Sequence, residues 1–232
     1  MADQGVSNER KRELEQMDPF QEALVRGLDF AASHKKQLGL IFGAVVVVCV
    51  IFSAVIYNFK RSEVQASQLV AKATTAYGES LQKDQDPQKA YEAVKAQFDT
   101  VLDEYANTSA GRMALMTYAK ICFDAKDYDK AYEIYGKALE TLDDTAGMEN
   151  FILSALGNLA LIKDDVQKAK FYYLRIEKGH SSLLKDEARF ALASIYAAEN
   201  DMASSLKMYE KIVTENQSSM YKAIAEARVA GE

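Results

Sequence analysis

The chain has 232 residues, of which 49% are hydrophobic and 27% charged, which is enough for one or two domains with a sizeable core. Its formal net charge is −6, so no basic surface for a phosphate backbone is expected, and nucleic acid is excluded as the main partner. Only two prolines and two cysteines occur, which favours a mostly helical protein and excludes a disulfide scaffold or a zinc cluster.

Residues 1–37 are predicted to form a cytosolic tail with one short amphipathic helix. The first part is polar and carries Arg10-Lys11-Arg12 among acidic residues. The helix is expected to begin after Asp18, which is suited to be its N-cap. Apolar residues then recur at four-residue spacing on one face, at Phe20, Leu24 and Leu28. This face is suited to a membrane interface or a partner helix, and a simple spacer is the alternative.

Residues 38–59 are predicted to form a transmembrane helix. The 20 residues from Leu38 to Tyr57 contain no charge and read LGLIFGAVVVVCVIFSAVIY. A helix of this length spans about 30 Å, the thickness of the hydrocarbon core of a bilayer. A buried core helix is rarely apolar on every side for so long. A cleaved signal peptide is the competing interpretation, but the preceding leader is too long and acidic and the apolar run is too long.

The charges that flank this segment balance, so they do not fix its orientation. Lys35 and Lys36 on one side are matched by Lys60 and Arg61 on the other. The extra basic residues of the tail favour a cytoplasmic N-terminus, and a long downstream domain translocates regardless of its charge. We therefore expect a single-pass membrane protein with a cytoplasmic N-terminus. If the cell is a Gram-negative bacterium, the anchor lies in the inner membrane and residues 60–232 lie in the periplasm.

Residues 60–232 carry four variants of one short signature, which predicts a helical repeat domain. The variants begin at Asp86, Asp127, Asp165 and Asp201, which are 41, 38 and 36 residues apart. The helix of the anchor is expected to continue through Leu81, either as one rod or as a kinked pair. The predicted helix pairs and final capping helix cover residues 64–105, 110–142, 150–178, 183–215 and 218–229. The turns between them are predicted at Asn107-Thr108-Ser109, Asp143-Asp144-Thr145, Gly179-His180-Ser181-Ser182 and Asn216-Gln217-Ser218.

The pattern within these pairs resembles the tetratricopeptide repeat, over roughly residues 64 to 230. Small residues stand where two antiparallel helices must approach closely, and an aromatic residue follows one turn later. The likeness is clearest in YAKICFDAKDYDKAYEIYGKAL and LGNLALIKDDVQKAKFYYLRI. The fourth unit departs from the pattern because Ser205 replaces the alanine of the signature. The resemblance implies an all-α fold in which one N-terminal transmembrane helix precedes a tetratricopeptide-repeat-like α-solenoid.

The order of segments, a tail, one anchor and a degenerate repeat domain, resembles the bacterial ancillary subunit of the SecYEG translocon. This resemblance implies a membrane-anchored protein–protein interaction module in the network of periplasmic chaperones. Its expected partners are translocon subunits, a membrane-anchored chaperone and unfolded secretory chains. Two alternatives have the same architecture: a structural assembly scaffold of the cell envelope, and an organelle import receptor whose repeats face the cytosol.

By the same resemblance, the first helix of each pair lines the concave surface and supplies a groove for a partner. Spacing of three and four residues places one stripe of each first helix on a single face. The predicted groove residues are Met113, Met116, Lys120, Phe123, Phe151, Ser154, Asn158, Leu161, Glu187, Phe190 and Ser194. Adaptable Met and Phe side chains suit loosely specific binding of apolar segments. The alternative is that these residues only pack between neighbouring pairs.

Nothing in the sequence indicates catalysis, so we expect that the protein is not an enzyme. It contains no Ser/His/Asp or Cys/His constellation, no glycine-rich phosphate loop and no metal-ligand spacing. No cofactor, metal ion or small-molecule substrate is therefore expected. Repeat proteins that grip a C-terminal carboxylate use a clamp of Lys, Asn and Arg, of which only Asn158 is matched here.

Overall fold

The computed structural model describes residues 19–142 and 147–231, and these residues form ten helices and no strand. The predicted all-α class is thereby confirmed. The basic tail, the N-cap at Asp18 and the turn at Asp143-Asp144-Thr145 lie outside the described residues. The chain divides into two units, Met1–Phe59 and Lys60–Glu232, each of which we describe by itself.

The first unit contains helix α2 and the beginning of helix α3. Helix α2 spans Pro19–Ser33, and α3, which starts after His34, spans Lys35–Asp84. Within the described part of the chain, α3 is the one helix long and apolar enough to cross a membrane, and none of its apolar window is buried. Its length and composition are therefore compatible with a single membrane span.

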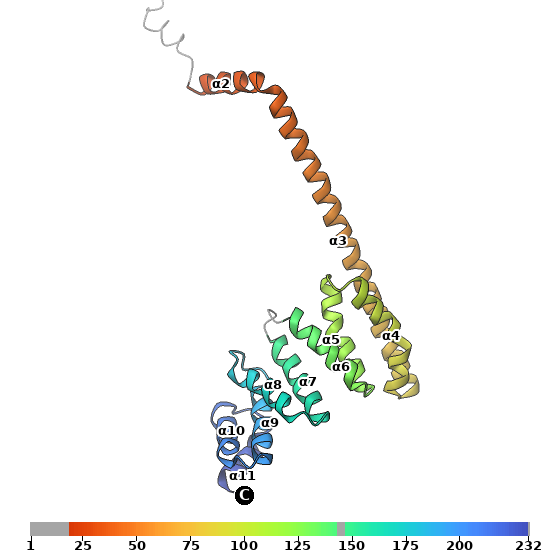
Figure 1. Cartoon of the computed structure of the whole chain (residues 1–232), viewed down its shortest axis with the longest axis vertical. Helices are drawn as coiled ribbons and strands as arrows, with labels where there is room; N and C mark the ends of the chain where they lie inside the picture. The colour runs from red at the N-terminus through yellow and green to blue at the C-terminus, as the bar shows by residue number, and fades with distance from the viewer. Residues whose placement is uncertain (1–18, 143–146, 232) are drawn as a thin grey trace, which may run out of the picture. The chain divides into compact units, whose positions relative to one another are not determined.

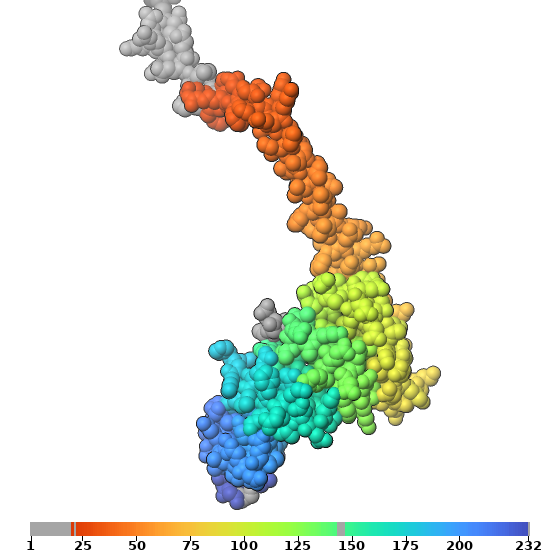
Figure 2. Space-filling model, viewed as in Figure 1, coloured from red at the N-terminus to blue at the C-terminus, as the bar shows by residue number. Residues whose placement is uncertain are grey.

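The second unit contains the end of α3 and eight further helices. These are α4 (Pro87–Glu104), α5 (Ser109–Asp124), α6 (Tyr128–Thr141), α7 (Met148–Ile162), α8 (Val166–Lys178), α9 (Lys185–Ala198), α10 (Met202–Glu215) and α11 (Lys222–Ala230). From α4 onward each helix packs against the next one in the chain (Figure 1). Side chains fill the gaps between these ribbons, as the space-filling view shows (Figure 2).

Helices also contact the second helix along the chain. The hydroxyl groups of Tyr132 in α6 and Tyr172 in α8 are 2.8 Å apart and form a hydrogen bond. The Glu63 carboxylate of α3 accepts hydrogen bonds from the backbone N–H groups of Ser109 and Ala110, at 2.7 and 2.9 Å. This carboxylate satisfies two of the donors that the first turn of α5 leaves open. The second unit is thus connected both between neighbouring and between alternate helices.

The four signature segments form the turns that lead into α4, α6, α8 and α10. Their aspartates, Asp86, Asp127, Asp165 and Asp201, are the N-caps, and each side chain accepts a hydrogen bond from a backbone N–H of the first turn. The residue before each aspartate has a positive φ between 51° and 64°. In three of the turns, the aspartate N–H also bonds the carbonyl five residues earlier, at 2.8 to 2.9 Å. The repeated signature therefore encodes a repeated helix–helix turn.

The last residue of each signature lies in the core, at the side of the second helix that meets its neighbour. Ala90, Ala131 and Ala169 are fully buried, and Ser205 is 4% exposed. The Ser205 hydroxyl donates a hydrogen bond of 2.8 Å to the carbonyl of Ala193 in α9. This bond compensates for burial of the hydroxyl, so that serine can replace alanine in the fourth unit.

Two boundaries differ in detail from the sequence predictions. Helix α3 continues to Asp84, three residues beyond the predicted Leu81. The final helix begins at Lys222 rather than Ser218, because Ser219 is engaged in a turn. Its hydroxyl donates to Asp186 of α9 at 2.7 Å, and its Oγ accepts from the Tyr221 N–H at 3.1 Å. Side-chain bonds of this kind compete with helix formation.

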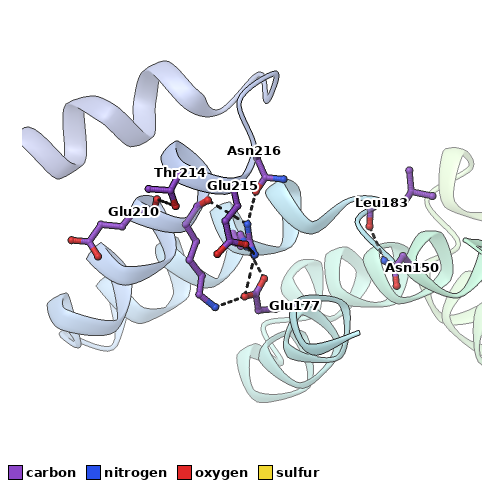
Figure 3. A network of polar contacts seen from close by, with 9 residues as sticks. Asn150, Glu177, Leu183, Glu210, Thr214, Glu215 and Asn216 are labelled. Atoms are coloured by element: carbon purple, nitrogen blue, oxygen red, sulfur yellow. Dashed lines mark hydrogen bonds and ion pairs between the residues drawn. The ribbon is translucent and has the colours of Figure 1, made fainter. Parts of the chain in front are cut away.

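Arg189 of α9 lies at the centre of a buried polar network that joins α8, α9 and the end of α10. Figure 3 labels its partners Glu177, Glu215 and Asn216. Its side chain is 4% exposed and pairs with Glu177, 8% exposed, at 2.7 Å. It also pairs with Glu215 and donates to the Asn216 side-chain oxygen at 2.6 Å. Lys211 of α10 pairs with the other oxygen of Glu177 at 2.5 Å. Arg189 and Glu177 are therefore both paired with opposite charges although little of either side chain is exposed to water.

This network predicts a specific loss of stability in acid. Burial raises the pKa of Glu177, but the hydrogen bonds and charges of Arg189 and Lys211 outweigh it, so the pKa lies below its ordinary value of 4.5. A lowered pKa in the folded state contributes stability that is complete above the unfolded value and is lost as the pH falls through the folded value. Denaturant titrations of the wild type and Glu177→Gln should therefore differ most above the ordinary pKa of 4.5 and converge as the pH falls through the lowered pKa of the folded state. A difference that does not change with pH would contradict the assignment.

Candidate functional site

Two pockets open between the first helices of successive pairs in the second unit. The α7–α9 pocket has a volume of about 660 Å³ and is lined mainly by α7, α8 and α9, with Tyr221. The α5–α7 pocket has a volume of about 280 Å³ and is lined by α5, α6 and α7. Asn158 of α7 lines both pockets, so they adjoin at this residue. We refer to the two pockets together as the groove.

The structure brings most of the predicted groove residues together in these two linings. Met116, Lys120, Phe123, Phe151, Ser154 and Asn158 line the α5–α7 pocket. Asn158, Leu161, Glu187, Phe190 and Ser194 line the α7–α9 pocket. Met113 lines neither pocket, and its side chain is 50% exposed near the beginning of α5. Helical spacing thus placed these side chains on one surface, while binding of a partner there stays a prediction.

Contacts between α7 and α9 position the acidic part of the groove. Leu184, the residue before α9, has a left-handed backbone with φ of 58°, and the Asn150 side chain donates a 2.7 Å hydrogen bond to the carbonyl of Leu183. Three residues into α9, the Glu187 carboxylate accepts a hydrogen bond from the Ser154 hydroxyl of α7. These two contacts fix the first turn of α9 against α7, and with it the place of the Glu187 carboxylate.

Aromatic rings form much of the wall of the α7–α9 pocket. The rings of Phe190 and Tyr221 are stacked with centroids 4.5 Å apart, and Phe190 also meets Tyr209 edge-on at 6.1 Å. The Tyr173 hydroxyl donates a 2.9 Å hydrogen bond to the side-chain oxygen of Asn158. Burial, and then the charge of Glu187, raise the pKa of Tyr173 and that of Tyr221, so both phenols stay protonated donors near neutral pH.

The α5–α7 pocket combines apolar side chains with a neutralised charge. Phe151 is 45% exposed and offers its ring at the pocket surface. Lys120 forms an ion pair of 2.5 Å with Asp124 one helical turn later, so its charge is already balanced. Burial raises the pKa of Tyr135 to about 12, with smaller contributions from Asp124 and Cys122. The pocket therefore presents apolar surface without a net charge of its own.

Several groove residues come from helices that sequence reasoning assigned to other roles. Tyr173 of α8 is one of the aromatic residues that follow the small residues of the repeat, and Tyr221 lies within the predicted capping helix of residues 218–229, yet both line the α7–α9 pocket. Their positions depend on contacts across helices, such as the approach of the Tyr173 ring to Gly157, where an added Cβ would lie 2.8 Å from a ring carbon. For Tyr173 the available signal was its place one turn after the signature residue Ala169, but helical spacing did not reveal which helix its ring would face.

The arrangement is suited to binding the apolar side chains of an extended or helical polypeptide segment. Among residues 19–142 and 147–231, no group of three or more His, Cys, Asp or Glu side chains is placed to hold a metal ion. The Asn158 oxygen accepts from Tyr173, which leaves its amide NH₂ to face a ligand. No protein-family model and no curated protein matches this sequence.

Proposed function

We propose that this chain is a membrane-anchored protein-interaction subunit whose groove binds polypeptide segments. The observation that carries the proposal is the groove itself, in which two adjoining pockets present Met, Phe and Tyr side chains from successive helices. Pockets of a few hundred Å³ with apolar walls and a few polar groups are typical binding sites. Aromatic and Met side chains are also enriched where proteins meet one another.

We further propose that α3 crosses the membrane and that the second unit is a tetratricopeptide-repeat-like α-solenoid. Support for the span comes from the charge-free run of α3, which is long enough for a bilayer and unburied within the described chain. Support for the solenoid comes from the four equivalent capped turns and from the contacts between neighbouring and alternate helices. Such an anchor raises the local concentration of the groove near membrane partners, so weak contacts suffice.

In this proposal the groove faces the periplasm and works beside the secretion channel, with emerging chains or a membrane-anchored chaperone as its partners. The basic tail on the other side of α3 supports this orientation. Protease added to intact spheroplasts should degrade the second unit. Protection of the second unit from the protease would instead indicate that it lies in the cytosol. The full chain should also stay with membranes after a wash in alkaline carbonate.

Site-specific crosslinking in native membranes tests the groove directly. A photoreactive amino acid at Phe151 should crosslink newly made secretory chains and channel subunits, because this residue is 45% exposed in the α5–α7 pocket. The same amino acid at Phe171, which is 57% exposed but lines neither pocket of the groove, is the matched control and should crosslink far less. Equal yields at the two positions would contradict the groove as the binding site. One stable envelope complex in place of secretory chains would indicate an assembly scaffold.

A further inference from the structure

Glu187 is a carboxylate in the largely apolar lining of the α7–α9 pocket, and it has no cationic partner in the described part of the chain. Its neighbours in the lining include Leu161, Phe190, Ile195 and Tyr221. One of its oxygens accepts from the Ser154 hydroxyl, and none of the ion pairs among the described residues involves Glu187. Glu187 is half-buried, and a carboxylate that is partly shielded from water interacts more strongly with a cation than an exposed one does.

Some half-buried carboxylates of the same unit, such as Asp99 and Asp127, are held only by hydrogen bonds from neutral groups within the described residues, while others have cations. Glu177 is paired with Arg189 and Lys211, and Asp124 is paired with Lys120. Glu187 lies in the first turn of α9, close to the partial positive charge of the helix N-terminus. That partial charge stabilises a carboxylate only modestly. Glu187 is distinguished by its place: it is the one charged side chain in the lining of the α7–α9 pocket, and no cation of the described residues balances it.

Charge near the pocket favours a cationic ligand over an anionic one. Asp186, the residue before Glu187, is also acidic, and its carboxylate accepts only from the neutral Ser219 hydroxyl at 2.7 Å. The single lysine of the groove lining, Lys120, lies in the other pocket and is already paired with Asp124. An acidic segment or a chain terminus with a free carboxylate would therefore be repelled at the α7–α9 pocket.

We infer, building on the proposed function, that the α7–α9 pocket takes a lysine or arginine side chain carried within an apolar polypeptide segment. The Glu187 carboxylate is the counter-ion of that cation. The stacked rings of Phe190 and Tyr221 contact the methylene groups of the same side chain and the apolar residues on either side of it. The ligand class is thus a polypeptide in which basic and large apolar residues adjoin, and the neighbouring α5–α7 pocket takes a further apolar residue.

Binding of three short labelled peptides to the detergent-solubilised full-length chain tests this inference. The peptides share soluble flanks and an apolar centre that carries one lysine, one methionine or one glutamate. Fluorescence anisotropy should show the lysine peptide binding about tenfold more tightly than the methionine peptide and the glutamate peptide binding least. Glu187→Gln should reduce the affinity of the lysine peptide about tenfold and leave the methionine peptide unchanged. Glu210→Gln, which removes an exposed carboxylate of α10 outside both pockets, should change neither affinity.

The possible results separate this inference from the function on which it rests. If the lysine and methionine peptides bind equally well, or if Glu187→Gln weakens both alike, the cation preference is wrong while the groove still binds peptides. If no peptide binds, the proposed function and the inference fail together. The methionine peptide also reports whether Glu187→Gln is folded, because its unchanged affinity requires an intact pocket.

Discussion

Replacing Arg189 by methionine should lower the free energy of unfolding by about 3 kcal/mol, because it leaves the buried Glu177 carboxylate with one cation instead of two. The Glu215 carboxylate and the Asn216 side-chain oxygen would lose their donor in the same step. For a unit of this size the melting temperature should fall by about 10 °C. The loss can be followed by circular dichroism during thermal and denaturant unfolding of the full-length chain in detergent.

Arg175→Met is the matched control for this variant. Arg175 of α8 also forms an ion pair between helices, with Glu149 of α7, but both side chains are 40% exposed. Solvent screens such a pair, so its loss should cost under about 1 kcal/mol. Equal destabilisation by the two variants would contradict the claim that burial makes the Arg189 network more stabilising than an exposed ion pair.

The helices and the groove stripes were predictable because they depend on short-range periodicity. Residues three or four apart share a helical face whatever the rest of the fold does, so the stripe from Phe151 to Leu161 could be placed from spacing alone. The aspartates of the signature were recognisable as the first residues of a repeated segment, and the structure adds that they are N-caps. Sequence spacing did not tell whether a stripe faces a ligand or the next helix pair.

The Arg189 network and the Glu63 contact could not be predicted, because they depend on residues far apart in the chain. Arg189 is a charged residue among the buried Ala188, Leu192 and Ala193, and its burial becomes tolerable only through acids on α8 and α10. Glu63 reaches α5 across 46 residues of sequence. The unpaired state of Glu187 was equally invisible, since it depends on which cations the folded chain leaves out of reach.

Gly111→Ala is expected to destabilise the second unit by about 3 kcal/mol, because no space exists for the added methyl group. Its Cβ would lie 2.1 Å from the carbonyl oxygen of Tyr105, a backbone atom at the end of α4. That oxygen also accepts hydrogen bonds from the N–H and hydroxyl of Thr108, at 2.9 and 2.7 Å, so it cannot move without loosening the N-cap of α5. Moving α5 instead would strain the hydrogen bonds from its first turn to Glu63.

Gly136→Ala in α6 introduces the same methyl group where nothing lies within 4 Å of it. Alanine in a helix interior is more favourable than glycine by about 0.5–1 kcal/mol, so this control should be stabilising. The two substitutions therefore have opposite expected signs, and thermal unfolding of both full-length variants measures them side by side. If Gly111→Ala were also stabilising, the close approach of α4 and α5 would be wrong, and the junction that holds the first groove helix in place would have to be looser than its hydrogen bonds require.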